Sequence, residues 1–192
     1  MGREFELKFR ADSDIIAAIR KKYGDFTTIA METTYYDTFD LKLAMHHWTL
    51  RRRMENGVSV CTFKRPCTDG GRSEWEVNAG SIMDGVILLC QSGADWELMR
   101  CAAGGLTEVC GARFTRQAKV LEVPGATVEL ALDEGILIGK QKELPFTEVE
   151  VELKAGTDEA AVSFAKALAA EFGLTEESRS KFVRAMTLAM EP

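Results

Sequence analysis

Residues 49–64 constrain the fold more than any other segment of the chain. Two runs suited to strands flank Asn56-Gly57, a dipeptide that favours a type I′ turn because both central residues take positive φ values. A two-residue loop fixes the pairing register, and this register places Arg51, Arg53 and Lys64 on one face of the hairpin. Like charges this close repel one another unless carboxylates or a bound anion lie opposite them. The segment therefore predicts an antiparallel hairpin whose cationic face needs a partner.

Several other segments alternate between apolar and charged residues, and each predicts a strand with one charged face. These segments are residues 3–10, 72–77 and 146–154, and the two arms 116–122 and 127–133 that flank Pro124-Gly125. In the hairpin formed by these two arms, a register with Glu122 opposite Thr127 places Arg116 opposite Asp133. Helical patterns cover 12–23, an insert at about 82–105, and C-terminal segments within about 158–190. Hairpins combined with inserted and C-terminal helices predict an α+β fold.

The composition excludes several classes of protein. The net charge is −6, so broad nucleic-acid binding through a basic surface is not expected. The 5 cysteines form no Cys-x-x-Cys pair, so neither a disulfide framework nor a zinc ribbon is expected. No apolar run approaches the roughly 20 residues of a membrane-spanning helix, and the N-terminus lacks the pattern of a signal peptide. We therefore expect a single-domain cytoplasmic protein over residues 1–192 that binds no membrane.

The charged strand faces have two interpretations. A sheet with one solvated face explains any single strand. A small barrel with a polar interior explains all of the strands together, because such barrels fill their interior with side chains or hold one ligand. An interior that combines many cations with many carboxylates suits a polyanion together with a divalent metal. The cations would hold phosphate oxygens, and carboxylates are the oxygen ligands that Mg²⁺ and Mn²⁺ prefer.

An ordered set of short motifs resembles the CYTH domain, also known as the triphosphate tunnel metalloenzyme family. The set begins with the signature Glu-x-Glu-x-Lys at Glu4 to Lys8. It continues with Thr34-Tyr35-Tyr36-Asp37-Thr38, Leu50-Arg51-Arg52-Arg53, Thr62-Phe63-Lys64, Arg116, Asp133, Glu148-Val149-Glu150 and Ser180-Lys181. One departure is Phe114, at a position where many members of the family carry a lysine. The resemblance extends from residue 2 to about residue 186, which is nearly the whole chain.

The resemblance implies an eight-stranded antiparallel β-barrel that forms a tunnel, a small-molecule triphosphate substrate, and Mg²⁺ or Mn²⁺ as the cofactor. The metal ligands that it implies are Glu4, Glu6, Asp133, Glu148 and Glu150. The phosphate-binding cations that it implies are Lys8, Arg51, Arg53, Lys64, Arg116 and Lys181. Catalytic roles are expected for Glu4, Glu6, Lys8, Glu148 and Glu150. Lys181 lies at the start of the last predicted helix and would fit a plug at one end of the tunnel.

Members of this family differ in the reaction that they catalyse, and the sequence favours one branch. Residues 46–51, residues 66–76 and the helical insert are most similar to bacterial inorganic triphosphatases, which convert tripolyphosphate into pyrophosphate and phosphate. A class IV-type adenylyl cyclase, which forms cyclic AMP and pyrophosphate from ATP, stays open because motifs do not reveal a base pocket. A thiamine triphosphatase would use stacking aromatics, for which Trp48, Trp75 and Trp96 are candidates.

Two further questions stay open at the level of the sequence. The non-enzymatic alternative is a module that binds polyphosphate or a nucleotide without hydrolysis. The carboxylates of the predicted site argue against such a module, because an anion sensor would not place acids beside its cations. A homodimer formed through the helical insert is the second open question.

Overall fold

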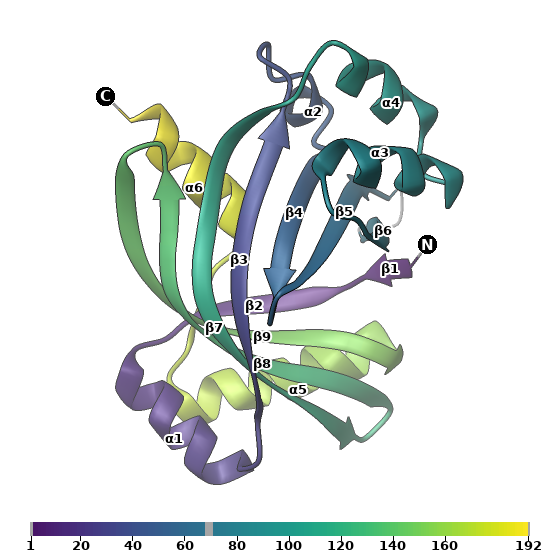
Figure 1. The fold of residues 1–192 in the computed structure, drawn as a ribbon. Coiled ribbons are helices and arrows are strands. Elements are labelled where there is room, and N and C mark those ends of the chain that lie inside the picture. Colours follow the sequence, from purple (N-terminus) through teal and green to yellow (C-terminus); the bar gives the residue numbers. More distant parts are fainter. Residues whose placement is uncertain (1, 68–70, 192) are drawn as a thin grey trace.

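The computed structural model describes residues 2–67 and 71–191. Within these ranges, ten strands form one antiparallel sheet that curls strongly around itself (Figure 1). The strands are β1 Gly2–Glu4, β2 Glu6–Arg10, β3 Thr27–Asp37, β4 Thr49–Glu55, β5 Val58–Pro66, β6 Arg72–Asn78, β7 Thr107–Val123, β8 Ala126–Gly139, β9 Lys142–Gly156 and β10 Thr175–Glu176. Their order across the sheet is β1-β6-β5-β4-β3-β7-β8-β9-β2-β10. This architecture confirms the α+β class and the barrel-like antiparallel sheet.

The first charged strand is divided in two, and this division joins the two sides of the curl. β1 pairs with β6, whereas β2 pairs with β9, and only Phe5 separates them. The prediction of one continuous strand over residues 3–10 is therefore wrong at Phe5, where the chain exchanges one neighbouring strand for another. Counted as one run, β1 and β2 give the eight expected strands in the described ranges, to which the short β10 is added.

Both predicted hairpin registers are confirmed. In the first hairpin Arg51 lies opposite Thr62, and the turn residues Asn56 and Gly57 both have positive φ values, 48° and 88°. In the second hairpin Arg116 lies opposite Asp133. The two registers place the charged side chains of β4, β5, β7 and β8 on the concave face of the sheet, because side chains alternate between the two faces of each strand.

Six helices accompany the sheet in the described part of the chain. They are α1 Ser13–Tyr23, α2 Lys42–Met45, α3 Ile82–Gln91, α4 Trp96–Ala103, α5 Asp158–Phe172 and α6 Lys181–Met190. The predicted insert is the pair α3 and α4, which packs against β5 and β6 in one buried cluster. α1 and α5 share a second cluster with β2, β8 and β9. None of the helices described is long and apolar enough to cross a membrane.

Helix α6 packs against the concave face of the sheet, whereas α1 and α5 cover its outside (Figure 1). Ala185 and Ala189 of α6 belong to a buried cluster with Met31 and Phe114. The helix begins at Lys181, because the hydroxyl of Ser180 accepts a hydrogen bond from the backbone nitrogen of Val183 and caps it. The helix therefore fills one end of the interior with Lys181 at its inner end.

Helix α6 approaches the sheet closely at one glycine. A Cβ atom on Gly139, the last residue of β8, would lie 2.5 Å from the backbone nitrogen of Ala189. Only glycine fits this contact without a shift of the helix. β8 and its neighbours β7 and β9 are 14, 17 and 15 residues long. β7 and β8 extend beyond the predicted arms, which were too short because Gly111, Gly135 and Gly139 interrupt the alternating pattern.

Asp37, within the Tyr-x-Asp-Thr motif, has a structural role rather than a place in the interior. Its carboxylate is fully buried and accepts hydrogen bonds from the backbone nitrogens of Leu43 and Ala44 at 2.8 and 2.9 Å. These are donors of the short helix α2, which otherwise lack partners at a helix N-terminus. The motif therefore fixes the connection between β3 and β4.

Candidate active site

The concave face of the sheet encloses a cavity of about 690 Å³. Most residues predicted to form the site line it: Glu4, Glu6, Lys8, Arg51, Arg53, Lys64, Arg116, Glu150 and Lys181. The other two, Asp133 and Glu148, are fully buried next to Glu150. The fold thus brings the predicted residues into one region, and their individual roles stay predictions.

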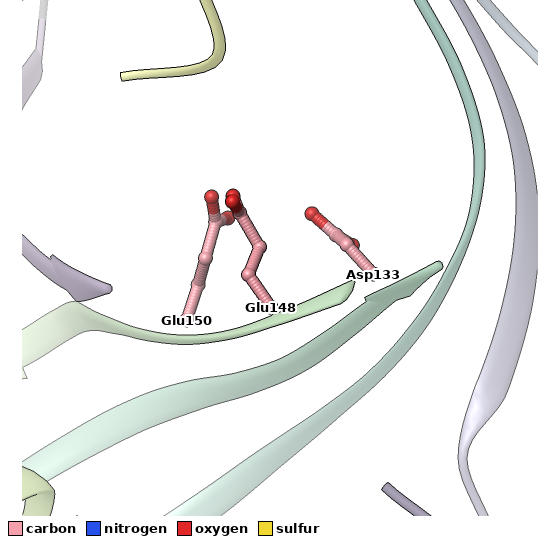
Figure 2. A group of neighbouring side chains, drawn as sticks. All are labelled: Asp133, Glu148 and Glu150. Atoms are coloured by element: carbon pink, nitrogen blue, oxygen red, sulfur yellow. The ribbon is translucent and has the colours of Figure 1, made fainter. Parts of the chain in front are cut away.

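Asp133, Glu148 and Glu150 form a buried acidic cluster. Asp133 of β8 lies opposite Glu148 of β9, and Glu150 follows on the same face of β9. The three side chains rise from the strands in the same direction (Figure 2), and ligand oxygens from each lie within 4.8 Å of one another. Three carboxylates buried this close need cations, because their mutual repulsion is not screened by water.

Three cations from the chain neutralise this cluster. The ammonium nitrogen of Lys181 lies 2.8 Å from Asp133 Oδ2 and 2.7 Å from Glu150 Oε1, and it also contacts Glu148. Arg116 donates two hydrogen bonds to Asp133, at 2.8 and 2.7 Å, and contacts Glu150. Arg184 contacts Glu148. The three N–H donors of Lys181 thus have three carboxylate partners.

The cluster sets the charge of its members. Burial alone would raise the pKa of Glu150, but Lys181 and Arg116 outweigh it and hold the pKa well below its ordinary value. Burial raises the pKa of Glu148, although Lys181 and Arg184 partly offset it. Glu150 is therefore a firmly ionised carboxylate that faces the cavity.

The wall formed by β4 and β5 is basic, and one of its arginines, Arg53, is poorly matched by acids. Arg53 donates to Thr33 Oγ1 at 3.1 Å, and its nearest carboxylate oxygen, on Glu55, is 3.4 Å away. Arg51 lies 3.7 and 3.9 Å from two carboxylates, and its buried Nε has no acceptor in the described residues. Burial and repulsion by Arg51 and Arg116 lower the pKa of Arg53 to about 10, so it stays charged at neutral pH. Such donors favour an anion.

The opposite wall carries a row of acids, of which only some were among the predicted site residues. Glu6 of β2 lies opposite Glu152 of β9, which lies opposite Glu129 of β8. All three line the cavity, and Lys154 lies 2.9 Å from Glu152. Burial raises the pKa of Glu152, an effect that Lys154 partly offsets. The alternation of residues 146–154 places Glu152 on the face of Glu150, so the sequence contained the signal for this residue.

Three further cations line the cavity outside the predicted set: Lys154, Arg179 and Arg72. Arg72 donates to Thr49 Oγ1 at 3.0 Å, while its buried Nε has no acceptor in the described residues. It lies on β6 opposite Glu4 of β1, whose carboxylate contacts Lys64. The signal for Arg72 was its position in the alternating segment 72–77.

Some residues near the site in sequence lie away from it in the structure. Arg113 points to the outer face, where it lies 3.5 Å from Glu143. It therefore does not take the place of the lysine that many members of the family carry at the position of Phe114. None of the three tryptophans is among the residues that line the cavity. Trp75 is buried and Trp48 packs against the α3–α4 cluster, whereas Trp96 is 60% exposed on α4. These positions give no support to a stacking role for the tryptophans.

Comparison with known proteins identifies relatives that match this geometry. The model of the CYTH domain family matches residues 2–186. An inorganic triphosphatase from Haemophilus influenzae is 27% identical over 195 residues, which cover 98% of this chain and 55% of that protein. The chain therefore spans about half the length of this curated relative.

Solved structures share the fold at low sequence identity. An enzyme from Hippeastrum, a candidate adenylyl cyclase with a dominant triphosphatase activity, has a TM-score of 0.70 at 18% identity, with 100% of this chain and 98% of that one covered. A Pyrococcus horikoshii protein has a TM-score of 0.64 at 22% identity, with 98% and 99% covered. The family match over nearly all residues, together with this fold, shows that the chain belongs to the CYTH domain family.

Proposed function

We propose that this protein is a metal-dependent hydrolase of triphosphates, and that inorganic tripolyphosphate is its main substrate. The observation that carries the proposal is the buried guanidinium of Arg53, which Arg51 and Arg116 repel and which lies on one wall of the cavity beside Arg51. Cations without adequate counter-charges are costly inside a protein unless an anion joins them. Guanidinium groups bind phosphate oxygens through two parallel hydrogen bonds, so a phosphate chain is an anion that suits this wall.

The cations form a continuous series along the cavity. Lys181 and Arg116 share the acidic cluster at the end next to α6, and Arg116 is close enough to Arg53 to lower its pKa. Arg51 is near the carboxylate of Glu74, which Lys64 also contacts at 3.1 Å. A linear polyanion lying along this series would meet a cation at each phosphate group.

The acidic wall has the donor chemistry of a magnesium or manganese site. Glu6, Glu129, Glu150 and Glu152 present carboxylate oxygens to the cavity, as does Glu4. Asp133 and Glu148 were also expected to be ligands, but both are fully buried and neither lines the cavity, which favours the cavity-facing acids. When bound, the metal would supply positive charge that offsets the negative charge developing on the phosphate oxygens.

The chain's own residues supply positioning and charge for the reaction. Phosphoryl transfer depends on positioning and electrostatic stabilisation more than on covalent chemistry. A water oxygen forms the new bond to the terminal phosphorus, the bridging P–O bond breaks, and its electron pair leaves with the diphosphate. Glu150 is ionised and faces the cavity, so it can orient this water, whose proton leaves with the phosphate product, while Arg51, Arg53 and Arg116 stabilise the phosphate oxygens.

One feature of the cavity is compatible with the alternative function, an adenylyl cyclase. Tyr35 and Phe182 both line it, with ring centroids 5.1 Å apart, and they provide an apolar surface beside Arg51. Such a surface could accept an adenine ring. Cyclic AMP formation from ATP would identify this activity.

The test compares products from tripolyphosphate, ATP and thiamine triphosphate, each with Mg²⁺, Mn²⁺ or a chelator. We expect fast metal-dependent release of phosphate from tripolyphosphate, and loss of this activity in Glu6→Ala. Cyclic AMP with no free phosphate would favour the cyclase. Tight tripolyphosphate binding without any turnover would favour a binding module and overturn the proposal.

A further inference from the structure

Glu177 is a buried carboxylate in an otherwise exposed connection between β10 and α6. Its exposed fraction is 3%, whereas Glu176, Ser178 and Arg179 are exposed. It is not among the residues that line the cavity, but the segment from Ser178 to Val183 is. Glu177 therefore lies directly behind the stretch of chain that brings Lys181 into the acidic cluster.

The carboxylate of Glu177 gathers four hydrogen bonds. Its Oε1 accepts from the backbone nitrogen and from Nε of Arg179, both at 3.0 Å. Its Oε2 accepts from Nη2 of Arg179 at 3.0 Å and from Nε of Arg10 at 2.9 Å. The backbone nitrogen of Glu177 also donates to the carbonyl of Lys8 at 2.9 Å. One residue thus ties strand β2 to the turn before α6.

Little else in the described structure fixes this turn. The strand β10 that precedes it has only two residues, which pair with Phe9 and Arg10. Two residues beyond Arg179, the ammonium of Lys181 meets its three carboxylates. The turn must hold its shape for the ammonium to reach them, because a small displacement would break charge-assisted contacts.

We propose that Glu177 is a positioning residue, which clamps Arg10 and Arg179 so that the turn delivers Lys181 to Glu148, Glu150 and Asp133. The effect on turnover rests on the proposed triphosphatase function, but the effect on the turn does not. The hydrogen bonds from Arg179, opposed by burial, lower the pKa of Glu177 to about 2. The clamp is therefore fully charged at neutral pH, and Glu177→Gln removes its charge while keeping its shape.

The first experiment measures the turn itself, independently of activity. In the full-length protein, hydrogen exchange of the Val183 and Arg184 amides reports on the first turn of α6, because both donate to Ser180. We expect Glu177→Gln to speed exchange at these amides by roughly 10-fold and to leave α5 unchanged. The matched control is Glu171→Gln, which removes a carboxylate that contacts Lys22 at the surface. Equal exchange in the wild type and in Glu177→Gln would overturn the clamp.

The second experiment is a double-mutant cycle with Lys181. We expect Glu177→Gln to lower kcat for tripolyphosphate roughly 10- to 100-fold with a smaller change in KM, because misplaced groups cost catalysis more than binding. In a Lys181→Ala background the same substitution should have little further effect, since the group that it positions is absent. Full additivity of the two losses would contradict the proposal. If the wild type does not hydrolyse tripolyphosphate, the proposed function fails while hydrogen exchange still decides on the clamp.

Discussion

The ammonium of Lys181 lies 2.7 Å from a carboxylate oxygen of Glu150, and this contact joins helix α6 to strand β9 inside the curled sheet. Asp133 and Glu148 complete the same set of contacts. The relationship explains why α6 packs inward rather than on the outside. A lysine is held at one end of the cavity by acids that would otherwise be buried without sufficient positive charge.

Substitution of Lys181 by alanine should therefore destabilise the fold as well as affect activity. Removal of one partner from a buried ionic cluster costs about 3–5 kcal/mol, because uncompensated charge stays behind. Denaturant unfolding at neutral pH measures this change. Lys22→Ala, at an exposed ion pair, is the control and should change stability far less. Equal stability of the wild type and Lys181→Ala would show that the cluster does not need the charge of Lys181.

Arg53→Met should separate stability from function. The guanidinium of Arg53 is buried and repelled by Arg51 and Arg116, so its loss should leave the melting temperature without ligand unchanged or higher. Hydrolysis of tripolyphosphate should fall by roughly 10²- to 10³-fold in kcat/KM, the cost of a removed charge-stabilising donor. The control is Arg52→Met on the outer face of the same strand, where Arg52 donates to Ser59. Normal turnover by Arg53→Met would show that the guanidinium of Arg53 on the basic wall does not contribute to hydrolysis.

Glu152→Gln tests whether the row of acids across β2, β9 and β8 holds the metal. The midpoint of Mg²⁺ activation should rise by about 10-fold or more, because a ligand oxygen loses its charge. The control is Glu143→Gln, at the other end of β9, where Glu143 faces Arg113 outside the cavity. Direct titration with Mn²⁺ provides a second measurement that does not depend on turnover. Unchanged affinity for both metals would place the ion elsewhere.

Acid titration should expose the contribution of Glu177 to stability. Its pKa is lowered from 4.5 to about 2 in the folded protein, so the folded state favours the ionised carboxylate. This stabilisation is fully present above about pH 4.5 and is lost as the pH falls through 2. The stability difference between the wild type and Glu177→Gln should therefore be largest near neutral pH and shrink between these values. A stability difference that grows on acidification would contradict the assigned direction of the pKa shift of Glu177.

Local sequence rules were sufficient where a short loop fixed the register. Asn56-Gly57 leaves one pairing of its arms, and this pairing occurs. The register considered for the hairpin at Pro124-Gly125, with Glu122 opposite Thr127, occurs as well. Alternation then identified the charged faces, which is why most of the predicted site residues line the cavity. The order of the family motifs indicated the chemistry of the site residues, including Lys181, which lies outside the alternating segments.

The features that local sequence patterns did not predict are determined by tertiary contacts. The break at Phe5 reflects a change of neighbouring strand, which no pattern within residues 3–10 encodes. The long ends of β7 and β8 contain glycines that lower strand propensity, yet Gly139 is needed for the approach of α6. The contacts of Lys181 with Asp133 and Glu148 join residues more than 30 positions apart in the chain. The sequence therefore identified the charged residues of the site but not which of them satisfy one another.

The most direct measurement is phosphorus NMR of tripolyphosphate incubated with the wild-type protein and Mg²⁺. We expect one pyrophosphate and one phosphate to appear for each tripolyphosphate consumed, and we expect a chelator to stop the reaction. A parallel sample of Arg116→Ala should be strongly impaired, whereas Arg113→Ala, on the outer face of the same strand, should behave as the wild type. Unconsumed tripolyphosphate, or equal turnover in the presence of the chelator, would contradict metal-dependent hydrolysis in this cavity.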